Sequence, residues 1–142
     1  MQDTFSIPKI ELHAHIGGCF RPSTFMELVM AKGADLDKVD FYKVDMEGAF
    51  EFFKIASQLV TDISTLKRIV YEIIEDFSKQ NTRYLELRSA PKSFKGSQTS
   101  AKDYIEAICE VMERAEDDFD IKVRYLISIN RQAGIEAASE TF

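Results

Sequence analysis

Three segments of this 142-residue chain alternate apolar and polar side chains with the period of a β-strand, and helical patterns separate them. The segments are residues 7–15, 82–91 and 121–130, and amphipathic stretches precede and follow the second. Strands that alternate with helices in this way form parallel sheets through right-handed crossovers. The order therefore predicts an α/β fold built on a parallel sheet.

Local signals place the ends of the predicted helices. Pro22 suits the first turn of one helix, and Gly33 suits its end, because proline fits the first helical position and glycine the left-handed position after the last. A second helix is predicted over 48–59. Within residues 61–81 the apolar spacing predicts a third helix, for which we expect Ser64 to be the N-cap.

The alternation in the first strand predicts two distinct faces. We expect its apolar side chains to share one face and its polar side chains the other: Ile10, Leu12 and Ala14 against Lys9, Glu11, His13 and His15. The polar faces of the strands together predict a charge network, formed by Lys9, Glu11, Glu86, Arg88 and Arg124. A solvated strand face is the alternative.

Composition excludes several classes of partner. The formal net charge of −6 comes from acids and bases that are mixed along the chain, so a nucleic acid is not expected as a partner. Cys19 and Cys109 lie far apart and form no C-x-x-C pair, which is typical of reduced thiols. No secretory leader or membrane-span pattern is evident, so we expect a cytoplasmic protein without a membrane partner.

The only two histidines of the chain lie one residue apart at the end of the first strand. His13 and His15 should project from the same face, near the carboxyl edge where parallel α/β folds place their active sites. Such a pair can bind one metal ion, although catalytic zinc needs a third protein ligand. A chance pair with hydrogen-bonded neighbours is the alternative. Cys19 is better explained as a small thiol, buried or semi-exposed, than as a further ligand.

The segment "PKIELHAHIGG" and the helix that begins near Pro22 resemble the opening of the adenosine deaminase family. The later segments "YLELRSAPK" and "IKVRYLISINRQAG" are similar to the adenosine deaminase-like branch of that family, which resembles N(6)-methyl-AMP deaminases. The resemblance extends from Pro8 to the last residues. It implies that residues 1–142 are the N-terminal portion of one (β/α)8 TIM-type barrel domain, with about three parallel strands and no internal boundary.

The resemblance also implies a zinc hydrolase that releases ammonia or an alkylamine from a purine. His13 and His15 would be ligands of its one zinc ion. The family's third histidine ligand, aspartate ligand, general-acid glutamate and water-orienting histidine have no match here and are expected beyond Phe142. No catalytic residue is therefore assigned within the chain. The remainder of the barrel, from this or another chain, is expected as a requirement for activity, and these residues alone are expected to be inactive.

For the substrate, the resemblance implies contacts by His15, Gly17, Ser57, Ser89, Ala90, Pro91, Lys92 and Asn130. Gly17 stands where the family usually has aspartate or asparagine. Ser57 and Asn130 stand where the nucleotide-specific branch is expected to have histidine and aspartate. The loop from Ser89 to Lys92 would contact a substrate monophosphate. An ordinary polar strand-to-helix loop explains this segment equally well.

The leading hypothesis is zinc-dependent hydrolytic deamination of an adenine nucleoside or nucleotide by the complete protein: adenosine, AMP or N(6)-methyl-AMP. Another amidohydrolase-type metal hydrolase is the first alternative, because many metal barrels share an H-x-H motif at the end of the first strand. A noncatalytic remnant that serves as an assembly module is the second, and the residues at 17, 57 and 130 favour it.

Overall fold

The computed structural model describes residues 4–33, 46–94, 96 and 98–129. Strands and helices alternate through these residues as the sequence predicts. In chain order they are β1 (Lys9–His15), the 3-10 turn η1 (Ile16–Gly18), α1 (Pro22–Lys32), α2 (Met46–Leu59), α3 (Ile63–Lys79), β2 (Thr82–Ser89), α4 (Ala101–Asp118) and β3 (Lys122–Ile127). The α/β class is confirmed.

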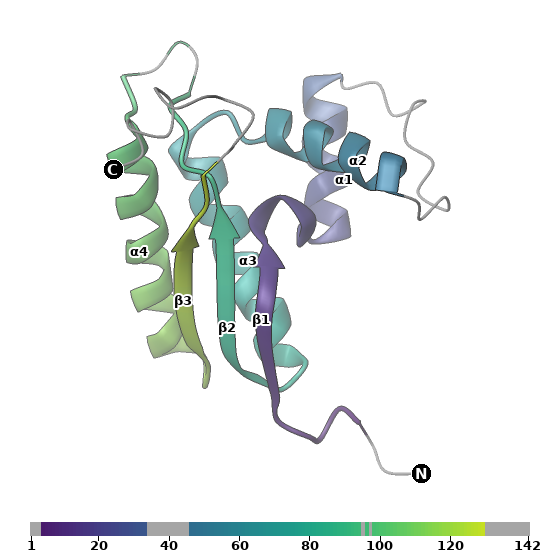
Figure 1. Ribbon diagram of the computed structural model, residues 1–142, viewed down its shortest axis with the longest axis vertical. Helices are drawn as coiled ribbons and strands as arrows, with labels where there is room; N and C mark the ends of the chain where they lie inside the picture. The colour runs from purple at the N-terminus through teal and green to yellow at the C-terminus, as the bar shows by residue number, and fades with distance from the viewer. Residues whose placement is uncertain (1–3, 34–45, 95, 97, 130–142) are drawn as a thin grey trace.

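The three strands form one parallel sheet in the order β1-β2-β3, so β2 is the middle strand. Helix α3 lies behind the sheet and α4 runs along β3, while α1 and α2 lie beyond the carboxyl end of β1 (Figure 1). One face of the sheet is thus covered by helices, and the segments that follow β1 and β2 begin at the same end of the sheet.

The covered face of the sheet packs into a single apolar core. Leu85 and Leu87 of β2 are fully buried, as is Val123 of β3. Their neighbours in the core include Ile73 of α3 and Ile108 of α4, which are equally buried. Each fully buried side chain of this size contributes about 1.5–3 kcal/mol to folding. This core holds the sheet against α3 and α4.

The helix boundaries confirm the predictions for α1 and correct the one for α3. Helix α1 begins at Pro22, and Gly33 ends it with the left-handed φ of 58° that glycine adopts without strain. The N-cap of α3 is Asp62, whose carboxylate accepts a 2.7 Å hydrogen bond from the Thr65 backbone N–H. Ser64 already lies inside the helix and donates to Asp62, so its prediction as the cap is wrong.

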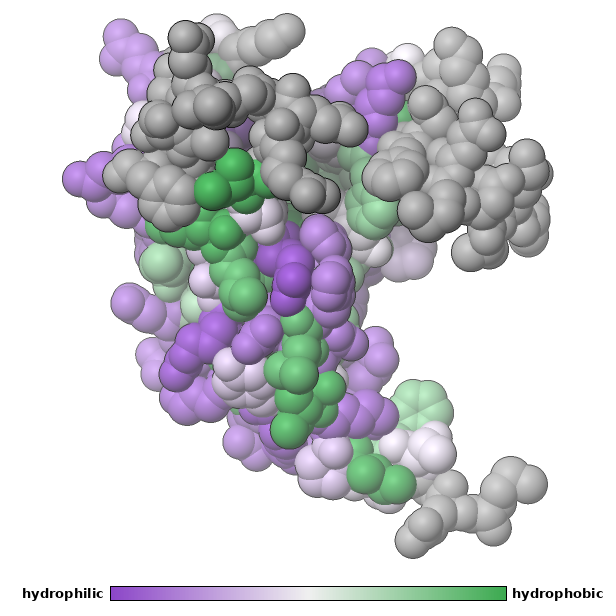
Figure 2. Space-filling view, viewed as in Figure 1, coloured by the Kyte–Doolittle hydropathy of each residue, from purple (hydrophilic) through white to green (hydrophobic). Residues whose placement is uncertain are grey.

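Strand β1 does not keep the two faces that its sequence predicts. Glu11 pairs with Leu85 and Ala14 with Leu87, so β1 has one residue more than β2 between these pairs, which is a β-bulge. Ala14 is buried at 3% exposure, whereas Ile10 and Leu12 are 69% and 54% exposed. Figure 2 shows the resulting apolar surface over β1 on the face that α3 does not cover. The predicted common face for these three residues is wrong.

The predicted charge network is also mostly absent from the described residues. Glu86 and Arg88 form an ion pair at 3.8 Å. The other three members have different partners: Lys9 donates to the Gln80 carbonyl, Glu11 accepts from the backbone of His13, and Arg124 pairs with Glu116.

None of the helices described here is both long and apolar enough to cross a bilayer.

Candidate metal centre and the loops around it

The two histidines converge at the carboxyl end of β1. The Nε2 atoms of His13 and His15 lie 3.1 Å apart, and the ring centroids are 5.0 Å apart. Two nitrogen ligands at tetrahedral angles around zinc, each at about 2.0–2.1 Å, would be roughly 3.3 Å apart. The pair therefore fits two corners of one coordination sphere. Within the described residues, no group of three or more histidine, cysteine, aspartate or glutamate side chains could hold a metal ion.

The electrostatic surroundings of His15 favour its neutral form. Burial lowers the pKa of His15, and the charges of His13 and Arg88 lower that pKa further. A lower pKa leaves the imidazole uncharged at neutral pH, with a lone pair available to a metal ion. The environment thus favours the metal-binding form of this side chain.

The turn η1 carries the next predicted site residue, Gly17, and brings it close to helix α2. Gly17 and Gly18 face the Phe53 ring, and that ring lies 6.1 Å from the His15 ring between centroids. Phe53 is 38% exposed, so it forms an apolar side of the space next to the histidines. Phenylalanines on a helix more often belong to the core than to a ligand site. Phe52 does stack on Phe25. Neighbouring residues on a helix point about 100° apart, and this geometry could have predicted that Phe53 points in a different direction from Phe52.

The loop after β2 brings two further predicted residues into contact. Lys92 donates from Nζ to the backbone carbonyl of Ser57 at 2.6 Å, and so joins this loop to α2. Burial lowers the pKa of Lys92, and the charge of Lys32 adds to this effect. Between β2 and Lys92, Ala90 is exposed and Pro91 is half-buried.

Ser89 has its polar contacts within a cluster of hydroxyl groups. Its Oγ lies 3.2 Å from the Tyr104 hydroxyl and 3.0 Å from the Tyr125 hydroxyl. Tyr125 also donates to the Ser89 carbonyl at 3.0 Å. A substrate contact by the Ser89 hydroxyl would have to coexist with these bonds. Asn130 lies outside the described residues, and the roles of the substrate residues stay predictions.

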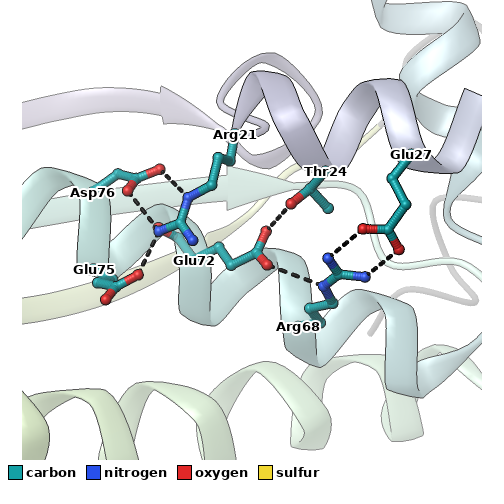
Figure 3. A network of polar contacts seen from close by, with 7 residues as sticks. All are labelled: Arg21, Thr24, Glu27, Arg68, Glu72, Glu75 and Asp76. Carbon is teal, nitrogen blue, oxygen red and sulfur yellow. Dashed lines mark hydrogen bonds and ion pairs between the residues drawn. The ribbon is translucent and has the colours of Figure 1, made fainter.

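A polar network fixes the segment that follows η1 on helix α3 (Figure 3). Arg21, the residue before α1, donates from Nε to Asp76 at 2.9 Å and from Nη2 to the other oxygen of Asp76 at 2.6 Å. The same nitrogen pairs with Glu75. These charge-assisted bonds hold the segment between η1 and α1 against helix α3.

The network continues along the interface between α1 and α3. Thr24 donates to Glu72 at 2.5 Å, and Arg68 donates from Nε to the other oxygen of Glu72 at 3.0 Å. Arg68 also forms a two-pronged pair with Glu27, with both bonds at 2.7 Å. Helix α1 is thus fixed on α3 along its first turns, immediately after the histidine strand and the turn η1.

Comparison with known proteins places these features in a family. The protein-family model described as adenosine deaminase matches residues 8–142. An N6-methyl-AMP deaminase of Bos taurus is 35% identical over 144 residues, which cover 94% of this chain and 40% of that protein. The chain thus spans about 40% of the length of this curated relative.

Solved structures show the same similarity. An Arabidopsis ADAL structure complexed with IMP matches with a TM-score of 0.83 and 35% identity, over 97% of this chain and 45% of that one. A Burkholderia ambifaria amidohydrolase with bound Zn matches with a TM-score of 0.73 and 29% identity, over 95% and 39% of the two chains. The three strands and their helices are the N-terminal part of a (β/α)8 barrel, as predicted.

Proposed function

This chain belongs to the adenosine deaminase family, and we propose that the intact protein catalyses zinc-dependent hydrolytic deamination of an adenine nucleoside or nucleotide. The observation that carries the proposal is the 3.1 Å separation of the His13 and His15 Nε2 atoms at the carboxyl end of β1. Active sites of (β/α)8 barrels lie at this end. The similarity to an N6-methyl-AMP deaminase and to an amidohydrolase with bound Zn supports the reaction and the metal.

In this proposal the two histidines supply two ligands, and the remaining ligands and the acid–base groups come from other parts of the barrel. Bound zinc would supply Lewis-acid activation of water. Water adds to the purine carbon that carries the exocyclic amine, the carbon–nitrogen bond breaks, and the amine leaves with a proton. AMP would give IMP and ammonia, and N(6)-methyl-AMP would give IMP and methylamine. The structural relative complexed with IMP supports a 6-oxo nucleotide as product.

The residues described here would line and orient the substrate. Phe53 offers an apolar surface next to His15, which suits the flat face of a purine. Gly17 and Gly18, which carry no side chains, allow the Phe53 ring to lie close against the turn η1. Lys92, near Ser57 on the rim, offers a cation for a monophosphate. Ser89, Ala90, Pro91 and Asn130 are further proposed substrate contacts.

The test uses the intact protein with adenosine, AMP and N(6)-methyl-AMP as separate substrates. Amine release and zinc content are measured for the unmodified protein and for His13→Ala and His15→Ala. Both variants should lose zinc and turnover, because each removes a ligand that the site cannot replace. Full activity in either variant would refute the ligand assignment, and no amine release from any of the three purines would refute the reaction.

A second experiment separates nucleotide from nucleoside as substrate. Lys92→Met removes the cation that would contact a monophosphate, so KM for AMP should rise at least about tenfold while KM for adenosine stays the same. Lys79→Met, on the exposed end of α3, is the control and should change neither value. Equal changes for AMP and adenosine would argue against a phosphate contact by Lys92.

A further inference from the structure

The bulge in β1 lies between Glu11 and Ala14 and so includes His13, and two of its backbone groups bond to side chains. The His13 N–H donates to Glu11 Oε1 at 2.7 Å, and the Leu12 carbonyl accepts from Arg88 Nη2 at 2.5 Å. We propose that Glu11 and Arg88 are positioning residues: they hold the bulge and thereby aim His13 and His15 at a shared metal ion. This inference rests on the proposed zinc site.

The bulge decides which face of the sheet the histidines occupy. Because side chains alternate along a strand, a shift of one residue moves every later side chain to the other face. Glu11 is in register with Leu85 of the helix-covered face. Without the extra residue, His13 and His15 would follow Glu11 onto that face. With it, Ala14 joins Leu87 in the core and His15 pairs with Arg88.

A bulge disrupts the ladder locally, so its backbone groups need other partners to keep their conformation. Here the partners come from two strands. Glu11 belongs to β1 and accepts from within the bulge, whereas Arg88 belongs to β2 and reaches across the strand pair. The two contacts hold the bulge from both sides and define the direction of the strand that leaves it.

The placement of Arg88 supports a positioning role. Its Nη2 bonds the Leu12 carbonyl and lies 3.8 Å from Glu86, yet its Nε is buried and has no hydrogen-bond partner among the described residues. Leaving a buried N–H without a partner is unfavourable. The guanidinium thus stays bonded to the bulge although its own Nε makes no hydrogen bond among the described residues.

The test measures zinc affinity in the intact protein by chelator competition, independently of amine release. Glu11→Ala and Arg88→Met should each weaken zinc binding about 10-fold or more, the effect typical of losing a group that orients a metal ligand. Glu11→Gln keeps an oxygen that can accept from the His13 N–H, so it should retain affinity within about twofold. Arg83→Met is the control, because Arg83 is an exposed residue of β2 that pairs with Asp120.

A spectroscopic measurement separates positioning from a loss of folding. With Co²⁺ in place of zinc, the visible absorption bands should change in Glu11→Ala and Arg88→Met and stay unchanged in Glu11→Gln and Arg83→Met, with equal helix content by circular dichroism. Unchanged affinity and spectrum in both Glu11→Ala and Arg88→Met would overturn the inference, as would equal losses in Glu11→Gln and Glu11→Ala. A protein that binds zinc as expected in all variants but releases no amine would overturn only the proposed function.

Discussion

Gly18 lies directly against the Phe53 ring, so a β-carbon at position 18 would be 2.7 Å from Cε1 and 3.2 Å from Cζ of that ring. Real side chains do not approach so closely, and Phe53 would have to move. Gly18→Ala should therefore displace the ring beside His15 and raise KM for the proposed purine substrate several-fold. Phe53→Ala should raise KM as well, because the apolar contact is lost.

The double variant tests the contact itself. Without the Phe53 ring, the methyl group of Gly18→Ala meets no obstacle from it, so the two substitutions should not be additive. KM of the double variant should equal that of Phe53→Ala alone. Additive effects would show that Gly18 acts through something other than the ring. Met30→Ala, at an exposed position of α1, is the control and should leave KM unchanged.

The cap of helix α3 should make stability depend on pH in the acid range. Hydrogen bonds from Ser64 and Thr65 lower the pKa of Asp62 to about 2. A lowered pKa in the folded state stabilises the protein above about pH 4, and this contribution is lost as the pH falls toward 2. Asp62→Ala should lower the free energy of unfolding by about 0.5–2 kcal/mol at pH 7.

Urea unfolding between pH 7 and pH 2.5 measures this effect. The difference between the unmodified protein and Asp62→Ala should shrink as the pH falls below 4. Asp62→Asn keeps an oxygen that can cap the helix, so at pH 7 it should be close to the unmodified protein. A difference that stays constant down to pH 2.5 would show that the ionised carboxylate has no special role.

The two cysteines should differ in reactivity. Burial, together with a smaller effect of the charge of Glu11, raises the pKa of Cys19 to about 11, so little thiolate forms at pH 8. Cys109 is exposed. Iodoacetamide at pH 8 should therefore modify Cys109 first, as followed by mass spectrometry of the peptides. In urea both thiols should react at similar rates, and faster reaction at Cys19 in the folded protein would contradict the prediction.

Arg21 should stabilise the interface between α1 and α3. Its side chain is 28% exposed and bonds both oxygens of Asp76 as well as Glu75. Arg21→Met should lower the free energy of unfolding by about 1–2 kcal/mol, because charged hydrogen bonds are lost. Arg21→Lys keeps the charge without the two-pronged geometry and should give an intermediate value.

The matched control is Lys79→Met, which removes an exposed partner of the same Glu75 carboxylate. Exposed pairs on a helix contribute little, so its unfolding midpoint should stay close to that of the unmodified protein. If Lys79→Met and Arg21→Met lower the free energy of unfolding equally, the network shown in Figure 3 contributes no more to stability than an exposed surface charge.

The order of strands and helices could be predicted because each element carries its own periodicity. The ends of α1 followed from Pro22 and Gly33, which act locally. The start of α3 was harder to predict, because residue types that often cap helices occur at three nearby positions: Thr61, Asp62 and Ser64. Asp62 caps the helix because its carboxylate accepts from the Thr65 backbone and from two hydroxyl groups at once. Apolar spacing cannot reveal that choice.

The histidine pair could be predicted, but the bulge in β1 could not. Residues 9–15 alternate without interruption, and the extra residue exists only relative to β2. Register depends on contacts between segments far apart in the chain, and a single strand carries no record of it. The same reason explains why the contact of Lys92 with Ser57, and of Phe53 with the glycines, emerged only from the structure.

The parallel order of the strands has a consequence for the folding pathway. Leu12 and Arg88, which join β1 to β2, are 76 residues apart, whereas Ser89 and Tyr125, which join β2 to β3, are 36 residues apart. Each doubling of a loop adds about 0.6 kcal/mol to the entropy cost of closing it. We therefore expect β2, α4 and β3 to assemble first and the histidine strand to dock on them afterwards, so that the bulge and the histidine pair take their places late.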